Sequence, residues 1–161
     1  MASEADHIAA ANLNQKTLCH LCQDVRIHGP WVAVVAFYKA LHIVEAVFAN
    51  DPDIKHCTDH GSREKALKKK LKYEHINRQY APLSRAATIA RYLHHSGKDY
   101  HSFFDYLDAT KIESELLFYR LHELEKSAAK FLKTPAQLKT IAQMRAAAAA
   151  TGNPTNSKTP A

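Results

Sequence analysis

The chain has 161 residues, enough for one domain with a sizeable core, and its 46% hydrophobic content excludes wholesale disorder. Three cysteines are too few, and odd in number, for a secreted disulfide framework, so we expect reduced thiols. The sequence shows neither the roughly 20 consecutive apolar residues of a membrane span nor the pattern of a signal peptide, so a cytoplasmic location without membrane association is expected.

The net charge of +6 belongs to the C-terminal end of the chain. The last acidic residue is Glu125, and six of the 22 lysines and arginines follow it, which leaves residues 1–125 with 16 basic and 16 acidic groups. A basic tail binds polyanions weakly and without sequence preference. The charge alone therefore does not indicate sequence-specific recognition of nucleic acid.

Glycine is scarce, with four residues, and the sequence lacks the period-2 alternation of strands, which predicts an all-α fold. The first expected helix begins after Ser3, whose spacing to Asp6 is that of a capping box. It runs to residue 23 and stops before the breaker formed by residues 28–30, His-Gly-Pro. A second helix, over 31–47, ends at the turn signal of residues 50–52, Asn-Asp-Pro.

After a polar loop, a third helix is expected over 63–77, where four lysines, at 68, 69, 70 and 72, form a solvated face. Pro82 is expected to open a fourth helix, which residues 94–97 close. A short helical piece follows near residues 100–108.

A long helix is then expected from Lys111, because Thr110 and Glu113 have capping-box spacing. Thr134, Pro135 and Gln137 repeat that signature for a last helix, which ends in the alanine run 146–150. The expected organisation is one bundle over 1–132, an additional helix within 133–150 and a disordered tail over 151–161.

The segment 31–47 is apolar on nearly every side, as expected for a central helix. Lys39 is the one residue expected to face water. His42 and Glu45 share a stripe with Trp31, Val35 and Tyr38, so both should lie out of bulk water and need polar partners. Ala33, Ala36 and Ala40 form a face of small residues that allows close approach of another helix, within the bundle or across a dimer.

Partners for His42 and Glu45 are expected from the next two helices. His60 and Arg63 share one face, and Ser84, Thr88 and Arg91 share another. If these helices pack around the central one, imidazoles and guanidiniums converge about a carboxylate, which suits phosphate binding or acid–base work on a phosphodiester. The alternative is a structural network in which Glu45 neutralises a buried arginine.

Cys19 and Cys22 have the spacing of half a zinc site. They lie inside an expected helix with no second matching pair, so we expect two small core residues, with zinc as the alternative. The eleven histidines are scattered, and the sequence contains no glycine-rich phosphate loop. Neither a cofactor nor a metal is expected.

Four strings resemble, in order, prokaryotic proteins of the HEPN superfamily. They are residues 6–15 (DHIAAANLNQ), 31–46 (WVAVVAFYKALHIVEA), 59–64 (DHGSRE) and 80–93 (YAPLSRAATIARYL). The resemblance covers about residues 6–132. It implies an up-and-down bundle of four to five main helices, commonly a homodimer. It also implies association with RNA or nucleotides in toxin-antitoxin or phage-defence settings, with an antitoxin or a nucleotidyltransferase as a possible partner.

The nuclease members of that superfamily carry an arginine and a histidine separated by four to six residues, and they cleave RNA without metal. Here Arg91 is followed by His94 and His95 after only two and three residues, so the motif is not present at the family spacing. If the chain is an endoribonuclease of this kind, Arg91 is the candidate phosphate clamp, with His94 or His95 as the candidate base. The accompanying polar cluster comprises Tyr38, His42, Glu45, His60, Arg63 and Tyr92. The rival expectation is a catalytically inactive dimerisation or interaction module whose polar cluster is structural.

Overall fold

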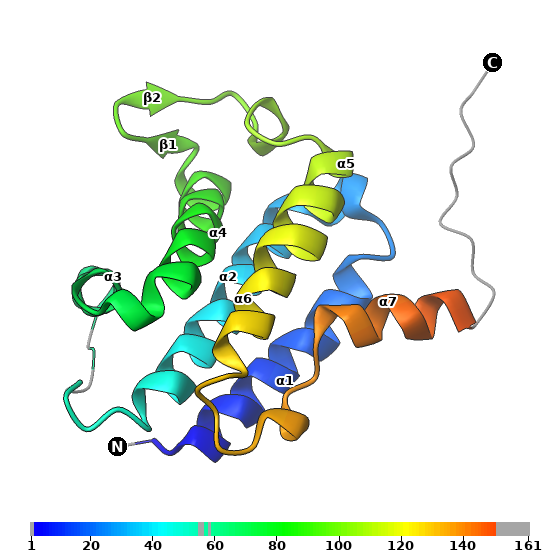
Figure 1. Cartoon of the computed structure of the whole chain (residues 1–161). Helices are drawn as coiled ribbons and strands as arrows, with labels where there is room; N and C mark the ends of the chain where they lie inside the picture. Colours follow the sequence, from blue (N-terminus) through cyan, green and yellow to red (C-terminus); the bar gives the residue numbers. More distant parts are fainter. Residues whose placement is uncertain (1, 55–56, 58, 151–161) are drawn as a thin grey trace.

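In the computed structural model the protein folds as an all-α helical bundle, described for residues 2–54, 57 and 59–150 (Figure 1). The central helix, α2 (Val25–Phe48), packs against α1 (Glu4–Leu21), against α4 (Glu74–Tyr92) and against a composite helix. This composite helix consists of α5 (Ala109–Lys111), the π-helical η3 (Ile112–Leu121) and α6 (His122–Ala128). The all-α prediction is confirmed.

The first helix begins as predicted and the second begins earlier. Ser3 and Asp6 form the expected capping box. The predicted break at residues 28–30 is wrong, because Asp24 caps the N–H groups of Arg26 and Ile27, and α2 then runs through Pro30. Gly29 is needed there for close packing, since a Cβ would lie 2.7 Å from Ile112 Cδ1.

Most of α2 is enclosed by the other helices. By length and composition this helix could cross a membrane, contrary to the expectation from the sequence, yet 72% of its most apolar stretch is buried inside the bundle. The small face of Ala33, Ala36 and Ala40 is fully buried, so it is used within one chain. Lys39 is also completely buried, and the prediction that it faces water is wrong.

The chain after α2 differs from the two helices predicted over 63–77 and from Pro82 onward. The chain forms α3 (His60–Lys69), a 3-10 turn η1 (Leu71–Tyr73) and then α4, which begins at Glu74 and passes through Pro82. The helix breaks at Lys70, whose backbone is extended and whose ammonium binds Asp51 and Asp53. Two members of the predicted solvated lysine face, Lys70 and Lys72, thus pair with the buried Asp51.

Pro82 does not begin a helix. A proline inside a helix loses one hydrogen bond to the carbonyl four residues earlier, which here belongs to Arg78. Arg78 is exposed, so water can reach that side of α4 and replace the lost bond. The packing of Leu83, Ala86 and Ala87 in the core holds the helix through this point.

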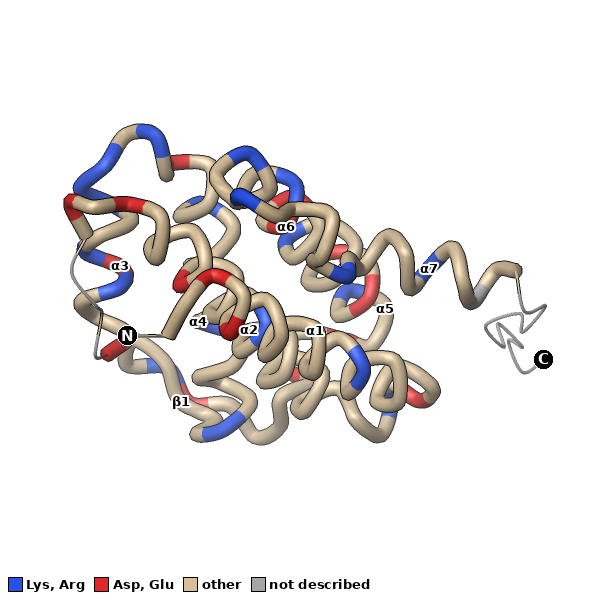
Figure 2. Tube along the Cα trace, turned by 90° about the horizontal axis from the view of Figure 1, so that it is seen from below, with Lys and Arg blue, Asp and Glu red and all other residues tan. Residues whose placement is uncertain are grey.

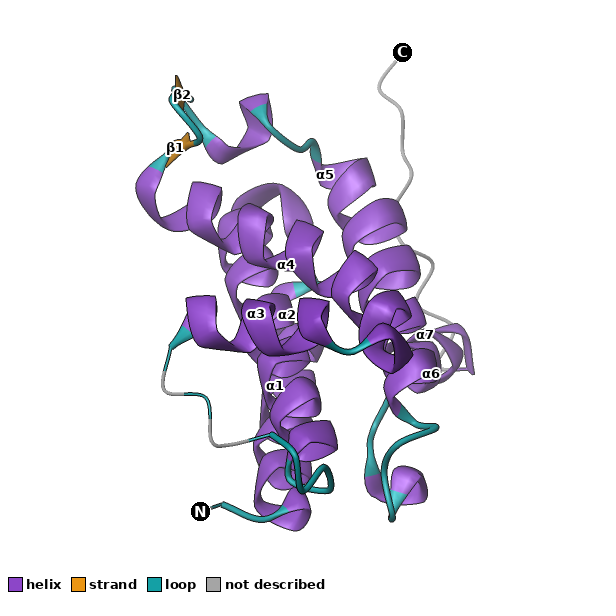
Figure 3. Ribbon diagram, turned by 60° about the vertical axis from the view of Figure 1, so that its left-hand side comes forward, coloured by secondary structure: helices purple, strands orange, loops and turns teal. Residues whose placement is uncertain are grey.

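A small hairpin follows α4 at one end of the bundle (Figure 3). Leu93 ends the helix in the left-handed conformation, with φ of 52°. The strands β1 (His94–His95) and β2 (Lys98–Asp99) pair antiparallel. Their turn has positive φ at Ser96 and Gly97, as in a type I′ turn. The 3-10 turn η2 (Phe103–Asp105) then leads to α5.

The last two predicted helix starts are both displaced. Asp108, rather than Thr110, caps the composite helix by accepting the N–H of Lys111 at 2.9 Å. The predicted start after Thr134 yields only the 3-10 turn η4 (Pro135–Gln137), because the Thr134 hydroxyl donates to Glu4 instead of capping. The last helix is α7 (Ile141–Ala150), which projects from the body of the bundle (Figure 2). The predicted tail, 151–161, lies outside the described residues.

Candidate functional site

The centre of the predicted polar cluster is a buried ion pair between α2 and α3. Arg63 Nε lies 2.6 Å from Glu45 Oε1, and the two side chains are 7% and 6% exposed. The capping box of Asp59 and Ser62 fixes the start of α3, and Arg63 Nη1 donates to the Asp59 carbonyl at 3.3 Å. Glu45 therefore neutralises Arg63, as the structural alternative expected.

Tyr80 of α4 extends this centre into the core. Its ring is fully buried and packs on Phe37, with centroids 5.5 Å apart. Burial raises the pKa of Tyr80 to about 12, against the opposing effect of the nearby Arg63 guanidinium. The Tyr80 phenol thus stays neutral at physiological pH.

Two histidines form the outer edge of the cluster. His60, the first residue of α3, is exposed, and its Nδ1 lies 3.4 Å from Arg63 Nη1. His42 is half-buried, and its Nδ1 lies 3.3 Å from Nδ1 of His7 on α1. In this hydrogen bond one ring donates its N–H and the other ring accepts it, so the two Nδ1 atoms share a single proton.

The environment lowers the pKa of both edge histidines. For His60 the causes are partial burial, then the positive charges of Arg63 and Arg91. For His42 they are burial, then His7, with Arg63 adding to the effect and Glu45 opposing it. Both imidazoles are therefore neutral at pH 7, and each has a nitrogen able to accept a proton.

Arg91 lies in the last turn of α4 and acts on the cluster through its charge. Its Nε donates to the carbonyl of Ala87 at 3.0 Å, and its guanidinium carbon lies 5.3 Å from the centre of the Tyr92 ring. The Tyr92 and Tyr38 side chains are 67% and 37% exposed. The structure thus brings His42, Glu45, His60 and Arg63 together, with Arg91 near enough to influence His60.

The histidines proposed as a base for Arg91 lie on the hairpin. His94 Nδ1 is 2.6 Å from Asp99 Oδ1 on the opposite strand. His95 pairs with Lys98 in the strand register and is half-buried. The positive charge of Arg91 contributes to the lowered pKa of His60, and the pairing of Arg91 with His94 or His95 stays a prediction.

The cysteines differ in their surroundings. Cys19 is exposed, so the expectation that it packs in the core is wrong, whereas Cys22 is half-buried. Burial, followed by the charges of Glu113 and Cys19, raises the pKa of Cys22 to about 12. Within residues 2–54, 57 and 59–150, no three His, Cys, Asp or Glu side chains gather as metal ligands.

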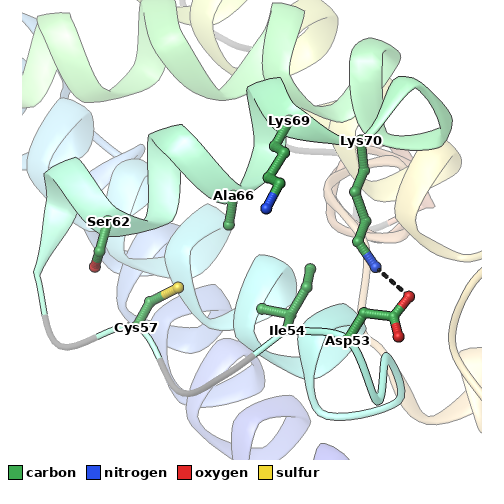
Figure 4. Close-up of a pocket in the computed structure, with 7 residues that line it drawn as sticks. All are labelled: Asp53, Ile54, Cys57, Ser62, Ala66, Lys69 and Lys70. Atoms are coloured by element: carbon green, nitrogen blue, oxygen red, sulfur yellow. Dashed lines mark hydrogen bonds and ion pairs between the residues drawn. The ribbon is translucent and has the colours of Figure 1, made fainter.

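A cavity of about 470 Å³ lies beside the Glu45–Arg63 pair, between α3 and the loop before it (Figure 4). Cys57 and Ser62 lie at one end, and Lys70 binds Asp53 at the other, while Lys69 extends over the apolar Ile54 and Ala66. Burial, then Glu45, raises the pKa of the Cys57 thiol. Sequence reasoning missed this cavity, because the lysines were assigned to a solvated face.

Sequence reasoning also missed a second buried ion pair. The Lys39 ammonium donates to Glu125 of α6, to the side-chain oxygen of Gln15 and to the main-chain oxygen of Lys139, the last at 2.9 Å. Burial lowers the pKa of Lys39 and raises that of Glu125, and each partner's charge opposes the effect. The available signal was a lysine inside a helix that is apolar on every side.

Comparison with known proteins adds no relative: no protein-family model, curated protein or solved structure matches the chain. The resemblance to the HEPN superfamily therefore stays a prediction.

Proposed function

We propose that the chain is a HEPN-like bundle that binds RNA or a nucleotide through a phosphate group held at the edge of the polar cluster. The observation that carries the proposal is the position of His60, exposed at the start of α3 and within the field of two guanidiniums, Arg63 and Arg91. An anion placed there is attracted by Arg91 and gains a hydrogen-bond donor when His60 takes up a proton.

The two arginines have different roles in this proposal. Arg63 is neutralised by Glu45 and orients the cluster. Arg91 meets no carboxylate within hydrogen-bonding distance among the residues described, so its charge is available for a phosphate. The exposed rings of Tyr92 and Tyr38 supply surfaces on which bases can stack, a common mode of single-strand RNA recognition.

Metal-independent RNA cleavage is the second candidate function. The observation that favours it is the lowered pKa of His60, which leaves a neutral imidazole able to take a proton from a ribose 2′-hydroxyl. Arg91 would stabilise the charge that develops on the phosphate. His94 and His95 remain the alternative bases implied by the family resemblance.

The rival is a catalytically inactive interaction module. It is favoured by the Glu45–Arg63 pair, because the two charges neutralise each other without a ligand. Ile27 and Trp31, on the same stripe of α2 as Tyr38, are 69% and 62% exposed. Large exposed apolar side chains suit an interface, and a homodimer, an antitoxin or a nucleotidyltransferase is the partner proposed for them.

Binding of a fluorescently labelled, mixed-sequence single-stranded RNA, followed by anisotropy, tests the proposal. We expect Arg91→Gln to weaken binding by roughly tenfold, the effect of losing one good charged contact. The matched control is Arg78→Gln on the same helix, because Arg78 is exposed and already paired with Glu74. If both variants bind as the wild type does, the phosphate site is not at Arg91.

The same RNA, incubated with and without EDTA, tests cleavage. The enzymatic candidate predicts metal-independent products from the wild type, lost in Arg91→Gln. They should also be lost in one of His60→Gln, His94→Ala and His95→Ala, which tells the three candidate bases apart. RNA that stays intact with the wild type removes the enzymatic candidate and leaves binding. Absence of binding as well leaves the interaction module.

A further inference from the structure

Residues 137–141, whose backbone is extended at Leu138, contact α1, α2 and α6 through their main chain, and we call the surface that they cover the groove. Asn12 of α1 makes two bonds to the backbone on either side of Leu138. Its side-chain nitrogen donates to the Gln137 carbonyl, and its oxygen accepts the Lys139 N–H, each at 2.8 Å. This is the pairing that one asparagine side chain can offer to any extended peptide.

The buried ion pair completes the contacts of the segment. Lys39 of α2 donates to the Lys139 carbonyl at 2.9 Å, and Glu125 of α6 accepts the Ile141 N–H at 2.9 Å. Three helices thus present polar side chains to four main-chain groups within residues 137–141, which connect η4 to α7. None of these four bonds requires a particular side chain in the segment.

Side chains of the segment contribute at two positions. Leu138 and Ile141 are 3% and 0% exposed, whereas the Lys139 side chain is exposed. The groove therefore binds the backbone of the segment and encloses two branched apolar side chains, which lie three residues apart in the sequence. This is the way in which a binding site recognises an extended peptide, with main-chain bonds for affinity and pockets for specificity.

The chain on either side of the segment makes contacts of its own. Glu4 binds the N–H groups of Lys133 and Thr134, at 3.0 and 2.8 Å, so the path as far as residue 134 is fixed. Pro135 and Ala136 are exposed and connect this anchor to the segment. Beyond it, α7 projects from the bundle (Figures 1 and 2). None of the four bonds from Asn12, Lys39 and Glu125 to the segment is made by the exposed residues 135 and 136, which connect it to α6.

We propose that the groove of α1, α2 and α6 is a peptide-binding site, which residues 137–141 of the same chain fill in this structure and the same segment of a second copy can fill in exchange. The occupant is an extended peptide with a branched apolar residue, two intervening residues and a second branched apolar residue. The proposal is independent of RNA binding, because its residues lie apart from Arg91 and His60.

Hydrogen exchange on the intact chain tests whether the segment opens by itself. The amides of Lys139 and Ile141 are expected to exchange through an opening that leaves the amides of the α2 core protected. Asn12→Ala should accelerate exchange at these two amides at least about tenfold, the loss of two hydrogen bonds. Asn14→Ala, on the same helix, is the control. Exchange of the segment only together with the α2 core would overturn the proposal.

Exchange in trans is tested on full-length protein with a protease recognition sequence inserted between Pro135 and Ala136, folded first and then cut. A fluorescent peptide of residues 137–150 should replace the cleaved segment, as measured by anisotropy. The same peptide with Leu138→Asp and Ile141→Asp should bind at least about tenfold more weakly, because both pockets are apolar. Equal binding of the two peptides, or no replacement by the native one, contradicts the proposal, and neither outcome bears on RNA binding.

Discussion

Two ion pairs anchored on α2 are both buried, yet the rest of the fold encloses them differently. Lys39 and Glu125 are 0% and 1% exposed and bind main-chain groups of residues 139 and 141. Arg63 and Glu45 are 7% and 6% exposed and adjoin His60, a titratable side chain open to solvent. The first pair therefore positions the backbone, whereas the second has an edge that a ligand or a proton can reach.

The largest expected effect is at the Lys39–Glu125 pair, which we call the enclosed pair. Lys39→Met leaves Glu125 buried without its counter-charge and should lower the free energy of unfolding by about 3–5 kcal/mol, as measured by urea denaturation. Lys39→Met combined with Glu125→Leu should recover most of that loss, because two packed apolar side chains replace the pair. A double variant no more stable than the single one would show that the charges themselves hold residues 137–141.

Breaking the Arg63–Glu45 pair, which we call the open pair, should cost less stability. Arg63→Leu leaves Glu45 with His42, whose protonated form its charge favours, so His42 can compensate in part. We therefore expect a loss of about 2 kcal/mol in the same urea experiment. The comparison between the two pairs depends on this difference. A loss equal to that of Lys39→Met would mean that both sites are equally closed to water.

Mild acid should destabilise the protein through His42 and His60, the two histidines at the edge of the open pair. Because the folded-state pKa of His42 and His60 is lowered, the unfolded chain binds more protons than the folded one below the ordinary histidine pKa of 6.5. This contribution to stability is complete above pH 6.5 and is lost as the pH falls toward the folded-state pKa values. Between pH 7 and 5.5 we expect a decrease of less than about 1 kcal/mol, since His60 is exposed.

The variant His42→Gln identifies the source of that decrease. It should flatten the dependence of the unfolding free energy on pH in this range, and His122→Gln, a half-buried histidine on α6, serves as the control. A pH dependence that His42→Gln leaves unchanged would assign the effect to other groups.

The smallest effect is expected at a surface pair. Arg78 and Glu74 on α4 are both more than half exposed, at 56% and 55%. Arg78→Leu should change the free energy of unfolding by no more than about 0.5 kcal/mol, because solvent screens an exposed pair. A larger loss in the urea experiment would undermine the use of burial to rank the three pairs.

The features that local sequence patterns determine could be predicted. The capping box at Ser3 depends on residues three apart, and it is confirmed. The stripe that carries His42 and Glu45 follows from helical periodicity, and the need of a buried carboxylate for a cation pointed to the arginines of the next helices. The partner is Arg63, one of the candidates named from the sequence.

The predictions that failed depended on distant residues. Pro30 and Pro82 each remove one helix bond, and the packing of their helices outweighs that local loss. Lys39 was assigned to solvent because lysine usually is, but Glu125 lies 86 positions further along the chain. A pattern within one helix contains no information on a partner at that separation, so neither the enclosed ion pair nor the peptide groove could be predicted.

The apolar character of α2 has a consequence during synthesis of the chain. Residues 25–48 leave the ribosome before residues 74–128, which form α4 and the composite helix that cover them. For that interval the nascent chain displays a helix with the length and composition of a membrane span. Chaperones and targeting factors that bind such segments therefore compete with folding until the composite helix has been made.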